Sequence, residues 1–192
     1  MNQFEAVNIL DMVNAIGEDA VKAILSDFSC PKNMEIECFV KQNALEFAKR
    51  KMSITYLVID ENGTLVAIFT LTHKAVQLSN DNISSSMRKK IERHARLDEE
   101  SNTYMLSAFL IAQFGKNDQY KERISGNTLM DITMNVLVAV QHEIGGGVVY
   151  LECEDRPQLL SFYENEQNRY RAFGERYSDR DKVKYIQLLK LF

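Results

Sequence analysis

The sequence is short of prolines, cysteines and long apolar runs. Its 192 residues include two prolines, which leaves no proline-rich linker, so a single domain over residues 1–192 is expected. The cysteines Cys30, Cys38 and Cys153 contain no Cys-x-x-Cys pair and signal neither a disulfide framework nor a zinc site. No apolar run approaches a bilayer span, and acidic residues stand where a signal peptide carries lysines. We therefore expect a cytoplasmic protein with no membrane partner.

The charge balance also lacks a basic excess. The chain carries 27 acidic and 23 basic residues, a net charge of −4, which gives no whole-protein attraction to nucleic acid or anionic lipid. This balance favours a small-molecule or protein partner. The local exception is a basic cluster of Arg88, Lys89, Lys90, Arg93, His94 and Arg96. It is either a solvated helix face or a flap that contacts RNA or another acid. The histidines have no spacing that suits a metal, so no metal site is expected.

The apolar residues that are present change their period along the chain. Three- and four-residue spacing predicts helices over about residues 19–28 and 35–49. Two β-rich runs follow, 55–60 and 64–72, and the Asn62-Gly63 pair between them is typical of a hairpin turn. The second half then begins with a polar, serine-rich stretch, for which a helical insertion around residues 79–102 is expected.

The rest of the second half alternates between strands and helices. The nearly continuous apolar run 103–116 predicts a buried central strand, and 129–144 a helix that ends at a triple glycine. A buried strand over 148–154 and a short helix over 156–166 come next. The apolar C-terminus, 182–192, predicts either a buried strand or an edge strand that pairs with another subunit. Together these elements predict a mixed α/β sheet.

A polar loop with one glycine, Lys121-Glu-Arg-Ile-Ser-Gly-Asn-Thr128, precedes the helix predicted at 129–144. The first amides of a helix have no intrahelical acceptor and lie at the positive end of the helix dipole, so they favour anions. Arg123 would add a full charge, and Gly126 would let the backbone approach a diphosphate. The plain alternative is a capped helix start without a ligand.

The order of these segments resembles that of the Gcn5-related N-acetyltransferases. Arg123-Ile-Ser-Gly126-Asn-Thr128 is similar to their Gln/Arg-x-x-Gly-x-Gly/Ala pyrophosphate loop, and "LIAQFGK" stands where their acetyl-CoA-binding fourth strand stands. "VVYLECEDRPQLLSFYEN" looks like their fifth strand and the helix with a Phe-Tyr pair, and the first half looks like bacterial members that include toxin acetyltransferases. The resemblance covers about residues 20–192. It implies a mostly antiparallel sheet, flanked by helices, whose fourth and fifth strands splay apart.

The resemblance also implies a site, residue by residue. Acetyl-CoA would lie along Phe114, Gly115 and Lys116, and its pyrophosphate would be held by Arg123, Ile124, Ser125, Gly126, Asn127 and Thr128. Tyr163 occupies the position of the tyrosine that protonates the departing CoA thiolate, although a packed core tyrosine is the plain alternative. Two departures stand out. Thr128 replaces the second small residue of the loop, and Asn168-Arg169-Tyr170 lies near the position of the usual Gly-Phe pair.

Three functions follow from these observations. The leading one is an acetyl-CoA-dependent N-acetyltransferase for a primary amine of a small molecule or protein, without a covalent enzyme intermediate. The others are toxin-like acetylation of aminoacyl-tRNA, which the basic cluster favours and the net acidity opposes, and a non-catalytic acyl-CoA-binding module. Glu35, Glu37 and Glu92 are candidates for the base that accepts the amine proton, and the sequence does not choose among them. A homodimer is a further expectation.

Overall fold

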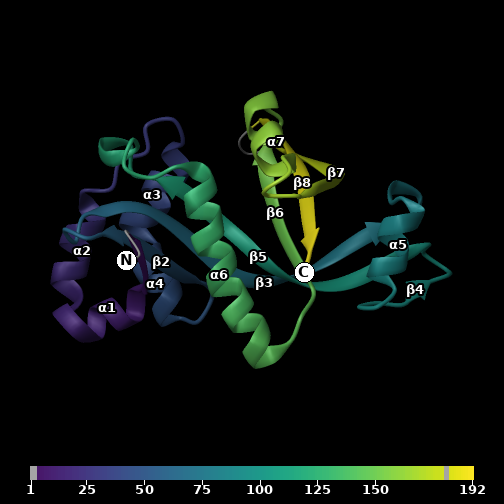
Figure 1. The fold of residues 1–192 in the computed structure, drawn as a ribbon, viewed down its shortest axis with the longest axis horizontal. Coiled ribbons are helices and arrows are strands. Elements are labelled where there is room, and N and C mark those ends of the chain that lie inside the picture. The colour runs from purple at the N-terminus through teal and green to yellow at the C-terminus, as the bar shows by residue number, and fades with distance from the viewer. Residues whose placement is uncertain (1–3, 180–181) are drawn as a thin grey trace. The chain divides into compact units, whose positions relative to one another are not determined.

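The computed structural model describes residues 4–179 and 182–192 as a mixed α/β fold built on an eight-stranded sheet (Figure 1). The strands are β1 (Phe4–Asn8), β2 (Ile54–Asp60), β3 (Leu65–Ser79), β4 (Leu97–Asp98), β5 (Thr103–Lys116), β6 (Val148–Glu154), β7 (Arg171–Ser178) and β8 (Val183–Leu191). The helices are α1 (Ile9–Ile16), α2 (Glu18–Ser26), α3 (Met34–Gln42), α4 (Ala44–Lys49), α5 (Ser85–Ile91), α6 (Gly126–Ile144) and α7 (Pro157–Glu164), with 3₁₀ turns η1 (Asn80–Asn82) and η2 (Asp118–Tyr120).

The strand order is β1-β2-β3-β5-β6-β8-β7, and β4 pairs with β5. The β5–β6 pair is parallel, whereas β1–β2, β2–β3, β4–β5, β6–β8 and β7–β8 are antiparallel. The registered partners of β5 and β6 are Phe109 with Val149 and Leu110 with Tyr150, although both strands are much longer. This confirms the mixed, mostly antiparallel sheet, with a short ladder between the strands that correspond to the fourth and fifth of the resemblance.

The chain divides into two compact units. Unit 1 comprises residues 1–72 and 111–136, and unit 2 comprises residues 73–110 and 137–192. The strands β3 and β5 and the helix α6 each contribute residues to both units. The single domain expected from the sequence stays a prediction.

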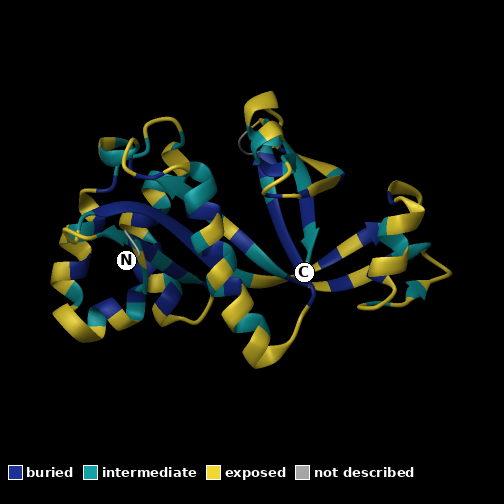
Figure 2. Ribbon diagram, in the orientation of Figure 1, coloured by how far each residue is buried: buried dark blue, intermediate teal, exposed yellow. Residues whose placement is uncertain are grey.

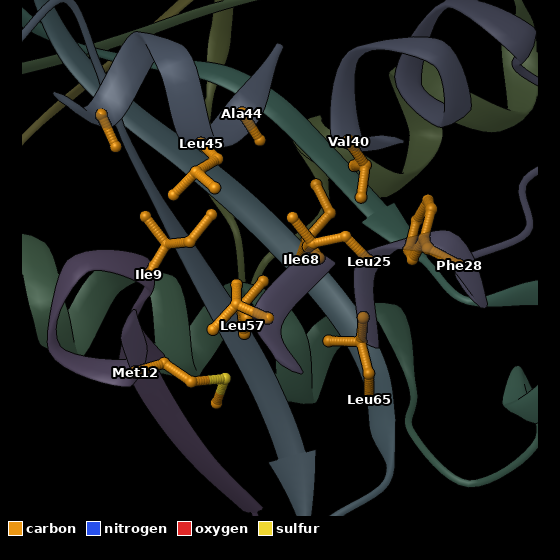
Figure 3. Close-up of a cluster of buried hydrophobic side chains, with 12 residues drawn as sticks. Ile9, Met12, Leu25, Phe28, Val40, Ala44, Leu45, Leu57, Leu65 and Ile68 are labelled. Carbon is orange, nitrogen blue, oxygen red and sulfur yellow. The ribbon is translucent and has the colours of Figure 1, made fainter. Parts of the chain in front are cut away.

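The core of unit 1 lies where α1 to α4 pack on β2 and β3. In Figure 3 the side chains of Ile9 on α1, Leu25 on α2 and Leu45 on α4 gather around Leu57 and Ile68 of the strands. Asn8 caps the start of helix α1, because its side chain accepts a hydrogen bond from the Leu10 amide at 2.9 Å. The sequence pattern predicted neither β1 nor α1. It also predicted one helix over residues 35–49, where the structure has two, α3 and α4, separated at Asn43.

The core of unit 2 joins the outer half of β3 to β5, β6 and β8. Its buried members include Leu78, Tyr104 and Tyr150, and Figure 2 shows most of β6 as buried. Ile83, which precedes α5, and Ile91, the last residue of α5, belong to this core. The predicted insertion at 79–102 therefore contains the end of β3, a helix and β4 rather than a helix alone.

The C-terminal strand β8 lies between β6 and β7, so it is an interior strand. This excludes the edge-strand interpretation of the C-terminus. The edge on that side is β7, which the sequence pattern missed. Its residues Arg171, Glu175, Arg176 and Tyr177 are exposed, and an exposed edge strand lacks the apolar alternation by which strands are recognised.

Candidate functional site

The end of β5 is fastened to the loop that follows it. The Lys116 ammonium donates hydrogen bonds to the backbone oxygens of Lys121, at 2.8 Å, and Ile124, at 3.2 Å. A Cβ on Gly115 would lie 3.2 Å from Cγ2 of Ile36, so α3 packs closely over this part of the strand. Lys116, which the resemblance places along acetyl-CoA, thus shapes the loop through its side chain. Phe114 is half-buried on the same strand.

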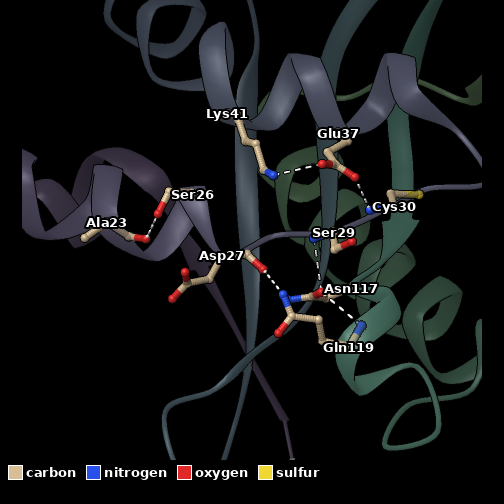
Figure 4. A network of polar contacts seen from close by, with 9 residues as sticks. All are labelled: Ala23, Ser26, Asp27, Ser29, Cys30, Glu37, Lys41, Asn117 and Gln119. Atoms are coloured by element: carbon tan, nitrogen blue, oxygen red, sulfur yellow. Dashed lines mark hydrogen bonds and ion pairs between the residues drawn. The ribbon is translucent and has the colours of Figure 1, made fainter.

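Asn117 joins this strand end to two other segments (Figure 4). It is 1% exposed. Its Oδ1 accepts from the Ser29 amide at 3.1 Å and the Gln119 amide at 3.3 Å, as Figure 4 shows. Its Nδ2 donates to the Leu65 oxygen at 3.0 Å. Because buried polar groups are stable only when they are paired, this single side chain fixes where the loop begins. No local sequence pattern marks Asn117 as a member of the site.

The Arg123 guanidinium is held by a carboxylate. Its Nη1 lies 2.5 Å from Oδ2 of Asp60 and 3.3 Å from Oγ1 of Thr64, and it stacks 4.7 Å from the centroid of the Tyr120 ring. Partial burial acts to raise the pKa of Asp60, but hydrogen bonds from the Thr64 amide and from Arg123 lower it overall. Arg123 therefore meets an acid in this structure, and its contact with a phosphate stays a prediction.

Ser125 caps α6. Its Oγ accepts from the Thr128 amide at 3.0 Å and lies 2.8 Å from the Thr128 hydroxyl, while its backbone oxygen accepts from the Leu129 amide at 3.1 Å. The helix starts at Gly126, three residues before the predicted boundary, because this cap adds a turn. The Ile124 side chain is buried, which fixes this loop to the protein interior. Gly126 and Asn127 thus stand in the first turn, where helix amides favour an anion.

Tyr163 lies in unit 2, on α7. It is 7% exposed, and its ring makes edge contacts with Phe162, at 4.9 Å between centroids, and with Tyr170, at 5.8 Å. Burial, with a smaller contribution from Cys153, raises the pKa of the Tyr163 phenol. The phenol therefore keeps its proton through the neutral range, as an acid must. Burial also raises the pKa of Cys153 to about 12, which disfavours the reactive thiolate form.

A polar network that no sequence pattern indicates centres on Glu152 of β6. The Glu152 carboxylate accepts from Nε of Arg176 at 3.0 Å and from Nη2 at 2.5 Å, from Nε2 of Gln187 at 3.1 Å, and from the Tyr150 hydroxyl. Partial burial opposes ionisation, but these bonds lower the pKa of Glu152 to about 2. Such a weak base is unsuited to take a proton from an amine near neutral pH. The network holds together strands β6, β7 and β8.

Replacing Glu152 with glutamine is expected to destabilise the protein by about 2 kcal/mol at pH 7, because the fold favours the carboxylate over the acid. The folded pKa lies below the usual 4.5, so this contribution is present above pH 4.5 and fades as the pH falls toward 2. Urea unfolding of wild type and Glu152→Gln at pH 7 and pH 3 should therefore show a smaller difference at pH 3. Glu175→Gln, which removes an exposed partner of Lys184, is the control and should change little at either pH.

The three candidate bases have different surroundings. The Glu37 carboxylate accepts from Lys41 at 2.8 Å and from the Cys30 amide at 2.6 Å, and these bonds lower the pKa of Glu37 (Figure 4). Glu92 accepts from the Tyr104 hydroxyl at 3.3 Å. Glu35 lies in the first turn of α3. These contacts do not identify which of the three glutamates accepts the amine proton.

The members of the basic cluster have different neighbours. Arg88 is directed at the backbone oxygen of Asn80, 3.4 Å away, and the His94 ring lies so close to Gly147 that a Cβ there would meet its Cε1 at 2.0 Å. Lys90 lines a hollow in unit 2. The cluster therefore has structural and exposed members.

Within residues 4–179 and 182–192, no three His, Cys, Asp or Glu side chains group as metal ligands would. No helix in the same ranges has both the length and the hydropathy of a membrane span.

Neither a protein-family model nor a curated protein matches the sequence. Solved structures do match, and they establish that the fold is that of the Gcn5-related N-acetyltransferases. A KacT structure with a tyrosine-to-phenylalanine mutation is similar with a TM-score of 0.65 at 12% identity, covering 97% of this chain and 95% of KacT.

Two further structures contain ligands. AtaT complexed with acetyl-methionyl-tRNAfMet is similar with a TM-score of 0.61 at 11% identity, covering 84% of this chain and 85% of AtaT. AtaTR bound with acetyl-CoA is similar with a TM-score of 0.59 at 13% identity, covering 97% of this chain and 94% of that chain. At these identities the similarity concerns the fold.

Proposed function

We propose that this protein is an acetyl-CoA-dependent N-acetyltransferase that acts on a primary amine. The observation that carries the proposal is the loop from Arg123 to Thr128, which Lys116 and Ser125 hold at the start of α6 within this fold. The AtaTR structure bound with acetyl-CoA supports the choice of co-substrate. Three free cysteines fit a reducing, cytoplasmic setting, and the toxin-like neighbours fit a bacterial source.

The proposed reaction is direct transfer. A neutral amine attacks the thioester carbonyl, a tetrahedral intermediate forms, and the carbon–sulfur bond breaks to give the amide and CoA. Backbone donors at the end of β5, near Phe114 and Gly115, would polarise the carbonyl. Tyr163 would donate its proton to the departing sulfur. A general base of the protein, which is not assigned to a residue, would accept the proton of the amine. Helix amides of Gly126 and Asn127 would hold the pyrophosphate.

The second candidate acceptor is aminoacyl-tRNA. The AtaT structure with acetyl-methionyl-tRNAfMet favours it, and so do the exposed cations of the basic cluster. The two acceptors are distinguished by thiol release from acetyl-CoA with an amine panel and, separately, with aminoacyl-tRNA at two salt concentrations, because tRNA binding is sensitive to salt. Acetyl-CoA binding without thiol release on any acceptor would identify a non-catalytic module. A homodimer that pairs strand edges would need an edge other than that of β8, which lies between β6 and β7.

The cofactor loop is tested by calorimetric titration of acetyl-CoA. We expect Arg123→Ala to weaken binding about tenfold or more, because a charged hydrogen bond to phosphate is lost. Asp60→Asn should tighten binding about threefold, since acetyl-CoA no longer competes with a carboxylate for Arg123. Lys22→Ala removes a cation that pairs with Glu18 on the same helix and is the control. No binding by the folded wild type, or equal binding by Arg123→Ala, would contradict the proposal.

A further inference from the structure

Unit 2 contains a hollow of about 680 Å³ that none of the proposed acetyl-CoA contacts line. Four cations surround it and come from four segments: Lys90 from α5, Arg169 from the turn after α7, Arg171 from β7 and Lys190 from β8. Among residues 4–179 and 182–192, no Asp or Glu lines it. In a chain with a net charge of −4, this is a local reversal of sign.

Three of the four cations of this hollow lack a carboxylate partner among the described residues. Among the described residues, Lys90, Arg169 and Arg171 make no ion pair, whereas Arg123, Arg156 and Arg176 each have a carboxylate partner. Like charges that converge without an acid repel one another and destabilise the folded chain. An anionic ligand would remove that cost.

Arg169 gives independent support. Its φ is 58°, in the left-handed region that glycine adopts without strain and that an arginine adopts at a cost. The turn around it is well anchored: its amide donates to the Asn165 oxygen at 2.9 Å, and the buried Asn168 donates to the Phe162 oxygen at 2.7 Å. Its Nε donates to the Glu166 oxygen at 2.6 Å. An arginine thus stands where backbone geometry favours glycine, near the position of the Gly-Phe pair of the resemblance, and its side chain faces the hollow.

The remaining lining is apolar or neutral. Met87 and Phe192 contribute apolar surface, and Ser84 and Ser86 contribute hydroxyls. We propose that this hollow binds a nucleotide, with the phosphate held by Arg169, Arg171 and the two lysines and the base packed on the apolar surface. Guanidinium groups match phosphate geometry with paired hydrogen bonds, and flat bases pack on aromatic and apolar side chains. The volume falls in the range of small-ligand pockets, which favours one nucleotide over an extended acidic peptide.

The nucleotide has two sources, a free mononucleotide or the end of an RNA strand. Fluorescence anisotropy of the full chain with a fluorescein-labelled six-nucleotide adenosine RNA, at 50 and 200 mM salt, tests the site. We expect binding that weakens with salt. Arg171→Gln should weaken it at least tenfold, whereas Lys184→Gln, which removes an exposed lysine of β8 that pairs with Asp155 and Glu175 and does not line the hollow, should change it less than twofold. Displacement of the RNA by AMP would identify the free nucleotide as sufficient, and displacement only by unlabelled RNA would identify a strand end.

Three results of this RNA measurement would overturn the proposal. These are no RNA binding at 50 mM salt, equal losses in Arg171→Gln and Lys184→Gln, and displacement of the RNA by hexaglutamate as effective as by AMP or RNA, which would indicate an unspecific cationic patch. The measurement contains no acyl donor, so its failure leaves the acetyltransferase proposal standing. Acetyl-CoA titration of Arg171→Gln should match wild type, and a lost affinity would instead assign the hollow to the co-substrate.

Arg169→Gly separates binding from folding. Glycine relieves the positive φ, so we expect an unfolding temperature equal to or above that of wild type together with at least tenfold weaker RNA binding. A structural role alone predicts no loss of binding. Retained RNA affinity in a folded Arg169→Gly would show that this side chain does not serve the ligand and would overturn the site.

Discussion

Tyr163→Phe is expected to lower kcat about 100-fold while leaving the affinity for acetyl-CoA within about twofold of wild type. The expected loss is at the lower end of the range for acid catalysis, for a reason that the structure supplies. Burial raises the pKa of this phenol, whereas a thiol such as that of CoA has a lower pKa, about 8.5. Complete proton transfer to the leaving sulfur is therefore uphill, and much of the effect comes from hydrogen bonding to the developing thiolate.

Tyr170→Phe is the matched control for this substitution. Tyr170 is fully buried in the same unit, packs its ring 5.8 Å from that of Tyr163, and burial raises the pKa of its phenol as well. Each variant loses one buried hydroxyl, so both should lose a similar amount of stability, about 1 kcal/mol. Thiol release measured with saturating amine and acetyl-CoA should fall in Tyr163→Phe and stay within about threefold of wild type in Tyr170→Phe. Equal rates in all three proteins would show that Tyr163 only packs.

The acid role also predicts a pH profile. Because the folded pKa of Tyr163 lies above its ordinary value of 10, ionisation of this group should not reduce kcat between pH 7 and 9.5. Any stability that depends on the neutral phenol is present below pH 10 and is lost as the pH rises through the folded pKa. A decline of the rate below pH 9 in wild type that disappears in Tyr163→Phe would contradict this assignment.

The parts of the fold that the sequence predicted are those with a local signal. The Asn62-Gly63 turn, the apolar run 103–116 and the glycine-terminated helix each depend on neighbours within a few residues. Helix α6 started earlier than expected because Ser125 adds a cap, which is also a local feature but a weak one. Strands β1 and β7 were missed because edge strands need not alternate apolar and polar residues.

The candidate site contains features that no local pattern could reveal. Arg123 and Asp60 are separated by 63 residues, and their ion pair exists because the hairpin turn and the loop before α6 meet in unit 1. Glu152 looked like an ordinary member of a buried strand, since its partners Arg176 and Gln187 lie on strands that come later in the chain. The left-handed backbone of Arg169 is likewise invisible in a sequence, because arginine seldom adopts it.

Asn117→Ala is expected to lower the free energy of unfolding by about 3 kcal/mol, the largest stability effect of any single substitution in the loop. The amide side chain serves three backbone groups, and removing it leaves the buried Leu65 oxygen without its donor and the Ser29 amide without its acceptor. The Gln119 amide, in an exposed residue, can turn to water, so its share of the loss is small. Urea unfolding at pH 7 measures the sum.

The same substitution should also weaken acetyl-CoA binding, because Asn117 fixes the point at which the chain leaves β5 for the loop that Lys116 fastens. Gln119→Ala is the control: this exposed side chain donates one hydrogen bond, to the Asp27 oxygen at 2.7 Å, and its loss should cost less than about 1 kcal/mol. Hydrogen exchange distinguishes a local from a general effect, since the Ser29 amide should lose protection in Asn117→Ala and keep it in Gln119→Ala. Unchanged protection at Ser29, or a stability within about 1 kcal/mol of wild type, would mean that water replaces the side chain and that the loop is held by Lys116 and Ser125 instead.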